Sequence, residues 1–220
     1  MSEPYKLKKA LKPKDIMNKK YKTLDIGDDW KKSIGIPEAS GSWLIFGDSG
    51  NGKTRFLLQL CKHLSKFKKV AYNPLEEGTK FSLATSLKDV EMSNPNNNIT
   101  FLQQETLAEL RQRIALKRSP DIYIIDSLQY LMKSPKNYKP IDIRDYKKLL
   151  RDFPDKLFII NSHAEGNFPA GATGKAIRFD ADIKIRVEGY KAFFISRFGG
   201  NEDYTIWKKG AEQYWTKKQN

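Results

Sequence analysis

Short apolar runs alternate with amphipathic stretches along most of the chain. Runs rich in β-branched and aromatic residues predict buried strands at 43–46, 70–73, 99–102, 121–126 and 157–161. Between these runs, apolar residues recur three and four positions apart, which predicts helices with one buried face. The clearest such stripe consists of Leu57, Leu60, Cys61 and Leu64. Strands that alternate with helices in this way predict an α/β fold with a mainly parallel central sheet flanked by helices.

The last quarter of the chain has a different pattern. Apolar residues alternate with charged ones from Ile183 to Glu188, which predicts a strand with one face in water. Gly189-Tyr190 predicts a tight turn into a second strand at 191–197, and a last strand is expected at 204–207. We therefore expect an antiparallel hairpin to extend the parallel sheet. Residues 166–180 contain three glycines among basic and aromatic residues, which predicts a flexible loop.

Composition describes a globular chain of ordinary core size, with 220 residues, 39% hydrophobic and 30% charged. We divide it into a basic, flexible arm (1–22), one domain (23–210) and a polar tail (211–220). No apolar run reaches the about 20 residues of a membrane span, and the N-terminus has no apolar signal-peptide core. The single cysteine, Cys61, is expected to be a buried thiol. These features predict a cytoplasmic protein without membrane contact.

The net charge of +14, from 40 basic and 26 acidic residues, favours a polyanionic partner. Nucleic acid is the usual polyanion for such a protein, and generic solubility charge is the alternative. Charge alone does not separate DNA from RNA.

One segment matches the phosphate-binding pattern G-x-x-x-x-G-K-[ST] at every fixed position. It lies between a predicted strand and a predicted helix, which is the context that the pattern requires. Backbone amides of such a loop curl around phosphate oxygens at a helix N-terminus. Lys53 can reach the outer phosphates, and the Thr54 hydroxyl can ligate Mg²⁺. The sequence therefore predicts a nucleoside triphosphate and Mg²⁺ site formed by Gly47, Asp48, Ser49, Gly50, Asn51, Gly52, Lys53 and Thr54.

Polar residues follow three other predicted strands, at the sheet edge where ligands bind in nucleotide-binding folds. Asp126 ends one strand and is expected to hold the Mg²⁺ shell with Thr54. Glu76 or Glu77 could polarise a water that attacks the γ-phosphate, or could belong to an acidic surface loop. His163 could sense the γ-phosphate or be structural, whereas His63 is expected on a helix surface. Apolar residues at 24–36 could cap the domain or line an adenine pocket.

Three basic segments are candidates for nucleic-acid contact, because lysines pair with phosphates and aromatic rings stack on bases. The first surrounds Tyr138 with Lys133, Lys136 and Lys139; the second is the predicted loop with Lys175 and Arg178. The first could equally be an ordinary exposed connection. The third is the arm at 1–22, which could bind nucleic acid, contact another subunit or stay solvated.

From Trp30 to Trp207 the chain resembles the RecA-type ATPases, most closely the RadA/Sms branch and more distantly the DnaB-type helicase domain. Ile124-Ile125-Asp126-Ser127-Leu128-Gln129 is similar to the I-D-S-[IL]-Q strand end of that branch. Tyr72 through Glu77 resembles its strand that ends in a Glu pair. His163-Ala164-Glu165-Gly166 resembles its sensor His and the following Glu-Gly turn, and Arg197-Phe198-Gly199 matches the end of its K-x-R-F-G element.

The resemblance implies an ATPase that uses ATP and Mg²⁺ and acts on DNA, preferentially single-stranded, in recombination, repair or replication. It implies Glu76 as the water-activating carboxylate, His163 as the sensor and Arg197 as a residue that completes a neighbouring subunit's site. The protein would then be a homo-oligomer, either a ring or a filament, with a partner protein in recombination or replication.

Several features depart from that branch. Ile195 replaces the lysine of K-x-R-F-G, and neither a zinc-finger Cys cluster nor a protease-like domain is present. This bare core resembles the short stand-alone RecA-like ATPases of phages and mobile elements. A nucleotide-gated DNA-binding, loading or regulatory protein with little turnover is the main alternative. A small-molecule P-loop kinase fits poorly, because it would leave the basic loops and Arg197 without a task.

Overall fold

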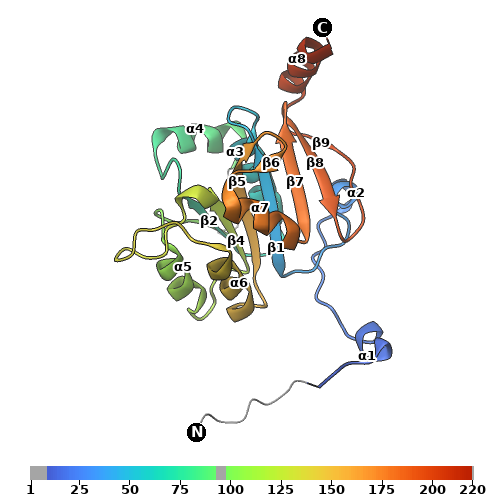
Figure 1. Cartoon of the computed structure of the whole chain (residues 1–220). Helices are drawn as coiled ribbons and strands as arrows, with labels where there is room; N and C mark the ends of the chain where they lie inside the picture. The colour runs from blue at the N-terminus through green and yellow to red at the C-terminus, as the bar shows by residue number, and fades with distance from the viewer. Residues whose placement is uncertain (1–8, 93–97, 220) are drawn as a thin grey trace.

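The computed structural model describes residues 9–92 and 98–219, and these form one twisted sheet covered by helices on both faces (Figure 1). The sheet has nine strands in the order β3-β2-β4-β5-β1-β7-β8-β9, and β6 pairs with β5 outside this order. The strands from β3 to β7 in this order pair in parallel, and β7, β8 and β9 pair antiparallel. The predicted fold class is therefore confirmed. The strands are β1 (Gly41–Gly47), β2 (Val70–Pro74), β3 (Ile99–Phe101), β4 (Ile122–Asp126), β5 (Leu157–Glu165), β6 (Phe168–Pro169), β7 (Ile183–Glu188), β8 (Lys191–Ser196) and β9 (Tyr204–Thr205).

Two apolar layers separate the helices from the sheet. Side chains of α2, α3 and α4 pack on one face, and those of α5, α6 and α7 pack on the other. Because β1, β2, β4 and β5 are buried on both faces, they are apolar without alternation, as expected for central parallel strands. The helices are α1 (Pro13–Met17), α2 (Asp28–Ile34), α3 (Lys53–Leu64), α4 (Phe81–Asp89), α5 (Leu107–Ile114), α6 (Ile143–Asp152), α7 (Gly171–Asp180) and α8 (Lys208–Gln219), with a 3₁₀ turn η1 (Leu128–Tyr130).

The start of α5 shows how local sequence sets an element boundary. The Glu109 carboxylate accepts hydrogen bonds from the backbone amide of Thr106 at 2.8 Å and from its hydroxyl at 2.7 Å. This capping box satisfies donors that a helix N-terminus leaves free. Hydrogen bonding lowers the pKa of Glu109, because it favours the charged carboxylate.

The segment at 166–180 differs from its prediction as a flexible loop. After the short strand β6, residues 171–180 form the regular helix α7, which buries Ile177 against α6 and the sheet. Gly174 lies so close to β5 and β6 that an added Cβ would approach Ser162 Oγ and Pro169 Cβ to 3.2 Å. The glycine therefore serves close packing of a helix here, and the tertiary contact outweighs its low helix propensity.

Both ends of the described chain contain a helix. The polar tail continues as α8 to Gln219, and Trp215 of this helix donates a hydrogen bond to the Gly189 carbonyl oxygen at 3.1 Å. At the other end, α1 lies away from the body of the domain (Figure 1) and buries no residue. Residues 1–8 of the predicted arm lie outside the described residues. Within the described ranges, no helix combines the length and apolar character needed to cross a membrane.

His63 is not the surface residue that its helical position suggested. Its ring stacks on Trp30 with centroids 5.1 Å apart, and Nε2 bonds to the Ile26 carbonyl oxygen. Burial lowers the pKa of this histidine, since the charged form is poorly solvated there. Leu24, Ile26, Trp30 and Ile34 cap the core beside α3, so this segment closes the domain and is absent from the lining of the cavity at the P-loop.

Candidate nucleotide-binding site

The carboxyl ends of the parallel strands meet at a cavity of about 410 Å³. Its wall includes Lys53 and Thr54 from the P-loop, Glu76 after β2, and Asp126 at the end of β4. Parallel pairing explains why they meet, because β2, β4, β5 and β1 end at the same sheet edge in register. Five of the eight predicted phosphate-loop residues, together with Glu76 and Asp126, therefore line one cavity, whereas Gly47 and Asp48 line a second one and Asn51 lines neither.

The P-loop turns directly into α3. Gly52 caps this helix with a φ of 93°, a left-handed conformation that glycine adopts without strain. The following amides lie at the helix N-terminus, which favours phosphate. Lys53 Nζ donates a hydrogen bond to the Asp48 carbonyl oxygen at 2.8 Å, within the same loop. Burial lowers the pKa of Lys53, and the nearby charges of Glu76, Asp126 and Asp48 oppose this shift.

Asn51 connects the P-loop to the turn between β7 and β8. Its Oδ1 accepts a hydrogen bond from the Gly189 amide at 2.7 Å, and its carbonyl oxygen accepts one from the Tyr190 amide at 3.2 Å. Sequence reasoning assigned Asn51 only to the phosphate loop. The structure adds a direct tie between that loop and the C-terminal hairpin.

Asp126 lies at the bottom of the cavity with 5% of its surface exposed. It accepts hydrogen bonds from the Tyr72 hydroxyl and from Asn161 Nδ2, the latter at 2.6 Å. Burial raises its pKa, and these two hydrogen bonds oppose the rise.

The residues present fit Mg²⁺, which prefers oxygen ligands and usually keeps several waters beside one or two protein groups and the phosphates. The cavity offers the Thr54 hydroxyl and the Asp126 carboxylate. Among the described residues there is no cluster of three or more His, Cys, Asp or Glu that could hold a metal by itself. The donor set therefore suits a cation that arrives with the nucleotide.

Glu76 and His163 form an ion pair or hydrogen bond across the cavity edge, with 2.9 Å between Oε2 and Nε2. The Ser127 hydroxyl lies 3.4 Å from both atoms. Glu77 also lines the cavity, but its carboxylate accepts a 2.7 Å hydrogen bond from Ser82. The geometry thus distinguishes the two glutamates that the sequence left as alternatives.

Gln129, in η1, holds the strand end that carries His163. Its Nε2 donates to Ser162 Oγ at 2.9 Å, and its Oε1 accepts from the His163 amide at 3.2 Å. Sequence reasoning used this glutamine only as part of a family motif. The position of Gln129 in that motif is the feature of the sequence that could have suggested a contact with β5.

Aromatic residues that sequence reasoning missed form the opposite wall of the cavity. Tyr190 lies in the β7–β8 turn and meets Trp207 edge-on, with ring centroids 5.1 Å apart. Arg55 lies over the Trp207 ring at 5.8 Å. Such a planar, partly apolar wall beside a P-loop suits a nucleobase. Of these three residues, only Arg55 has a position in the sequence that suggests a place at the site, because it directly follows the phosphate-binding motif.

The first predicted nucleic-acid segment is a narrow loop closed by backbone hydrogen bonds, including one of 2.8 Å from the Lys133 amide to the Lys139 carbonyl oxygen. Lys136, Tyr138 and Lys139 are exposed at its tip, with Tyr138 at 72%. Lys133 instead pairs with Asp142 at 3.1 Å and Asp145 at 2.9 Å. Three of the four predicted residues are therefore available to a ligand, and the lysine at the base supports α6.

The second predicted segment is more engaged with the protein itself. Lys175 pairs with Glu165 at 2.8 Å, and the Arg178 guanidinium lies over the Phe168 ring at 5.1 Å. Both cations belong to α7 rather than to a loop. Lys175 is exposed, whereas Arg178 is partly buried.

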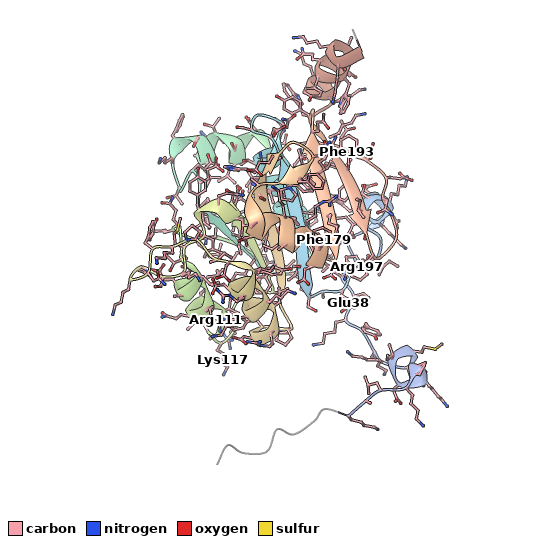
Figure 2. The ribbon with its side chains drawn as sticks, in the orientation of Figure 1. Glu38, Arg111, Lys117, Phe179, Phe193 and Arg197 are labelled. Atoms are coloured by element: carbon pink, nitrogen blue, oxygen red, sulfur yellow. The ribbon has the colours of Figure 1, made fainter. Side chains whose placement is uncertain are left out.

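Arg197 is not brought to the cavity of its own chain. It follows β8 at the amino end of β1, because Ile183 pairs with both Ser196 and Trp43. β1 spans seven residues, so at about 3.3 Å per residue the two sheet edges lie about 20 Å apart. Figure 2 shows Arg197 near Glu38, at the end of the sheet where β8 finishes. Arg197 pairs with Asp182 at 3.2 Å and is exposed.

Comparisons with known proteins agree with this geometry. No protein-family model matches the chain. Over 122 residues it is 31% identical to the DNA repair protein RadA of Chlamydia pneumoniae; the match covers 54% of this chain and 26% of that protein. The flagellar accessory protein FlaH of Methanocaldococcus jannaschii has a similar structure, with a TM-score of 0.56 and 16% identity over 83% of this chain and 92% of that one. A KaiC-like protein of Pyrococcus horikoshii gives a TM-score of 0.58 and 15% identity over 84% and 94%.

At these identities the solved structures show the fold alone, and the chain spans about a quarter of the curated relative's length. The fold nevertheless agrees with both kinds of comparison. The chain therefore has a RecA-like P-loop fold and is similar to ATPases of the RadA/DnaB branch.

Proposed function

We propose that this protein binds and hydrolyses ATP with Mg²⁺ and couples the reaction to DNA, preferentially single-stranded, in recombination, repair or replication. One observation carries the proposal: a single cavity gathers the P-loop lysine, the buried Asp126 and Glu76, and His163 pairs with Glu76 beside this cavity. The curated relative is described as a DNA repair protein, and the net charge of +14 suits a nucleic-acid partner.

In this proposal the P-loop amides and Lys53 hold the phosphates, while Thr54 and Asp126 hold the cation. Bound Mg²⁺ would neutralise charge on the β- and γ-phosphates. Glu76 lies at the cavity edge, where its carboxylate can orient a water and accept its proton. We propose Glu76 as the base because it pairs with His163 at the neighbouring strand end, whereas Glu77 is bonded to Ser82 of α4.

We propose further that His163 reports the γ-phosphate to the loop at 132–140. Its pair with Glu76 is half-exposed, and such pairs contribute about 0.2–1 kcal/mol. A phosphate oxygen can therefore replace Glu76 as the hydrogen-bond partner of His163. The Glu76 carboxylate is then free to bind water. The His163 amide contacts Gln129 in η1, and η1 leads directly into the basic loop. This chain of contacts supports coupling between nucleotide and DNA.

Arg197 lies too far from its own P-loop to serve it, which supports action on a neighbouring copy. Lys184 is the register partner of Ile195, and burial and the charge of Arg197 lower the pKa of Lys184. The surface around Arg197 thus keeps two basic residues, Lys184 and Arg197, although Ile195 replaces the lysine of the K-x-R-F-G element. We propose that they meet the ATP of the next subunit in a ring or filament.

Mixing subunits tests this composite site. Lys53→Ala and Arg197→Ala proteins should each be inactive alone, and a mixture should regain part of the turnover, because some interfaces combine an intact P-loop with an intact arginine. Absence of rescue at every mixing ratio would exclude action in trans. Gel filtration of each variant provides the control for assembly.

The decisive test of function is the ATP hydrolysis rate without nucleic acid and with single-stranded DNA, duplex DNA or RNA, each at two salt concentrations. We expect the largest stimulation by single-stranded DNA and a steep loss with salt, since phosphate contacts release counterions. An ATP hydrolysis rate that is the same under all four conditions would refute the coupling to DNA.

Ile195 favours a second candidate function. An exposed isoleucine replaces a cation of the K-x-R-F-G element, so a nucleotide-gated DNA-binding, loading or regulatory protein with little turnover is also consistent with the site. Binding to DNA that depends on ATP but proceeds without hydrolysis would support this candidate. Rapid hydrolysis with single-stranded DNA would remove it.

A further inference from the structure

Three buried side chains from neighbouring strands form a hydrogen-bonded group at the base of the cavity. Tyr72 of β2 and Asn161 of β5 flank Asp126 of β4, and their exposed fractions are 0%, 1% and 5%. The Tyr72 hydroxyl donates to Asp126 Oδ2, and Asn161 Nδ2 donates to Asp126 Oδ1 at 2.6 Å. Each carboxylate oxygen thus has one donor and keeps one further lone pair.

The orientation of the Asn161 amide follows from this contact. An ionised carboxylate only accepts hydrogen bonds, so the NH₂ group must face Asp126 and Oδ1 must point elsewhere. Oδ1 is buried and has no hydrogen-bond partner in the described part of the chain. A buried polar atom without a partner costs about 1–3 kcal/mol, and Asn161 lines the cavity. The amide oxygen therefore suits a donor that a ligand supplies.

The chemistry of the expected ligands identifies that donor. Phosphate oxygens of ATP are acceptors and cannot satisfy an amide oxygen. Waters in the shell of Mg²⁺ are strong donors, and Mg²⁺ keeps several of them when it binds proteins. Arg55 Nε, the other buried side-chain atom of the cavity wall without a partner among the described residues, is a donor and so has the opposite requirement.

We propose that Asn161 is a metal-shell residue of this site: its Nδ2 fixes Asp126, and its Oδ1 accepts a hydrogen bond from a water on the nucleotide-bound divalent cation. Tyr72 is a positioning residue that holds the other oxygen of Asp126. The inference rests on the proposed ATP and Mg²⁺ site and adds to it a residue outside its motifs. Asn161 then contributes to metal affinity, whereas the P-loop contributes to phosphate affinity.

The test separates the metal from the nucleotide. Binding of a fluorescent, non-hydrolysable ATP analogue to the full chain is measured in EDTA and across a Mg²⁺ titration. Second-shell residues typically contribute 10- to 100-fold to metal affinity, so Asn161→Leu should weaken the apparent Mg²⁺ affinity by about that factor and leave analogue binding in EDTA unchanged. Tyr72→Phe should weaken Mg²⁺ affinity by about tenfold. Tyr123→Phe is the matched control, because this buried tyrosine of β4 has no hydrogen-bond partner for its hydroxyl among the described residues.

The outcomes distinguish this inference from the proposed function. If the unmodified protein binds no analogue under either condition, the ATP site itself is wrong. If it binds with a Mg²⁺-dependent gain and Asn161→Leu keeps that gain, the role of Asn161 is refuted. Equal losses with and without Mg²⁺ would also refute it, since they indicate a contact with the nucleotide or a change in cavity shape. Circular dichroism checks folding, and Asn161→Ser replaces the leucine variant if that variant does not fold.

Discussion

Exchanging Glu76 for glutamine is the sharpest test of the chemistry proposed for the cavity. The change keeps the size of the side chain but removes its ability to accept a proton from water. Loss of a general base typically lowers turnover by 10²- to 10⁴-fold, or about 2.7–5.4 kcal/mol of activation free energy. The lost pair with His163, half-exposed, contributes only about 0.2–1 kcal/mol. Turnover should therefore collapse while ATP affinity changes by less than about fivefold.

Glu77→Gln provides the matched control one residue away. Its carboxylate accepts a hydrogen bond from Ser82, and a glutamine oxygen can still accept that bond. Turnover of Glu77→Gln should fall by less than about tenfold, whereas loss of the general base should lower it by about 10²- to 10⁴-fold. Phosphate release under saturating ATP and fluorescent-nucleotide binding measure the two quantities separately. A larger loss of turnover in Glu77→Gln than in Glu76→Gln would refute the assignment.

Other perturbations test the core, the base wall, the loop and a helix cap. Leu57→Ala, at a fully buried position of α3, should cost about 2–5 kcal/mol and lower Tm by about 4–20 °C in thermal unfolding. Trp207→Ala should weaken ATP binding about 2- to 13-fold in calorimetry without affecting tripolyphosphate, if the ring contacts the base. Replacing Lys136 and Lys139 by glutamine should reduce the salt slope of single-stranded DNA binding by about 1.4. Because the folded-state pKa of Glu109 is lowered, its stabilisation is present above about pH 4.5 and is lost as the pH falls through that lower pKa; Glu109→Gln should flatten this dependence in denaturant titrations.

Periodicity predicted the central elements well because their environment is simple. Strands such as β4 and β5 are buried on both faces, and α3 buries one stripe, so each leaves a clear apolar pattern. The polar residues at the strand ends were predictable for the same reason. Parallel strands in one sheet must end at one edge, and the register of Gly47 with His163 follows that rule.

Residues that depend on distant packing were not predictable. Tyr190 and Trp207 reach the cavity only because the C-terminal hairpin folds back on the P-loop. Residues 166–180 form a helix because Gly174 fits against β5 and β6, a contact that composition does not encode. His63 is half-buried because Trp30, from another part of the chain, stacks on it.

The hydrogen bond between Asn51 and Gly189 gives the β7–β8 hairpin a mechanical meaning. The turn of the hairpin is bonded to the phosphate loop, and its far end carries Arg197, with six residue pairs between them. A ladder of this length spans about 20 Å, and β7 also pairs with β1, so one sheet holds both ends of the hairpin. In the proposed assembly of identical copies, a movement of the phosphate loop together with this sheet would displace the arginine presented to the next copy. The order in which neighbouring subunits hydrolyse ATP would then depend on the stiffness of this hairpin.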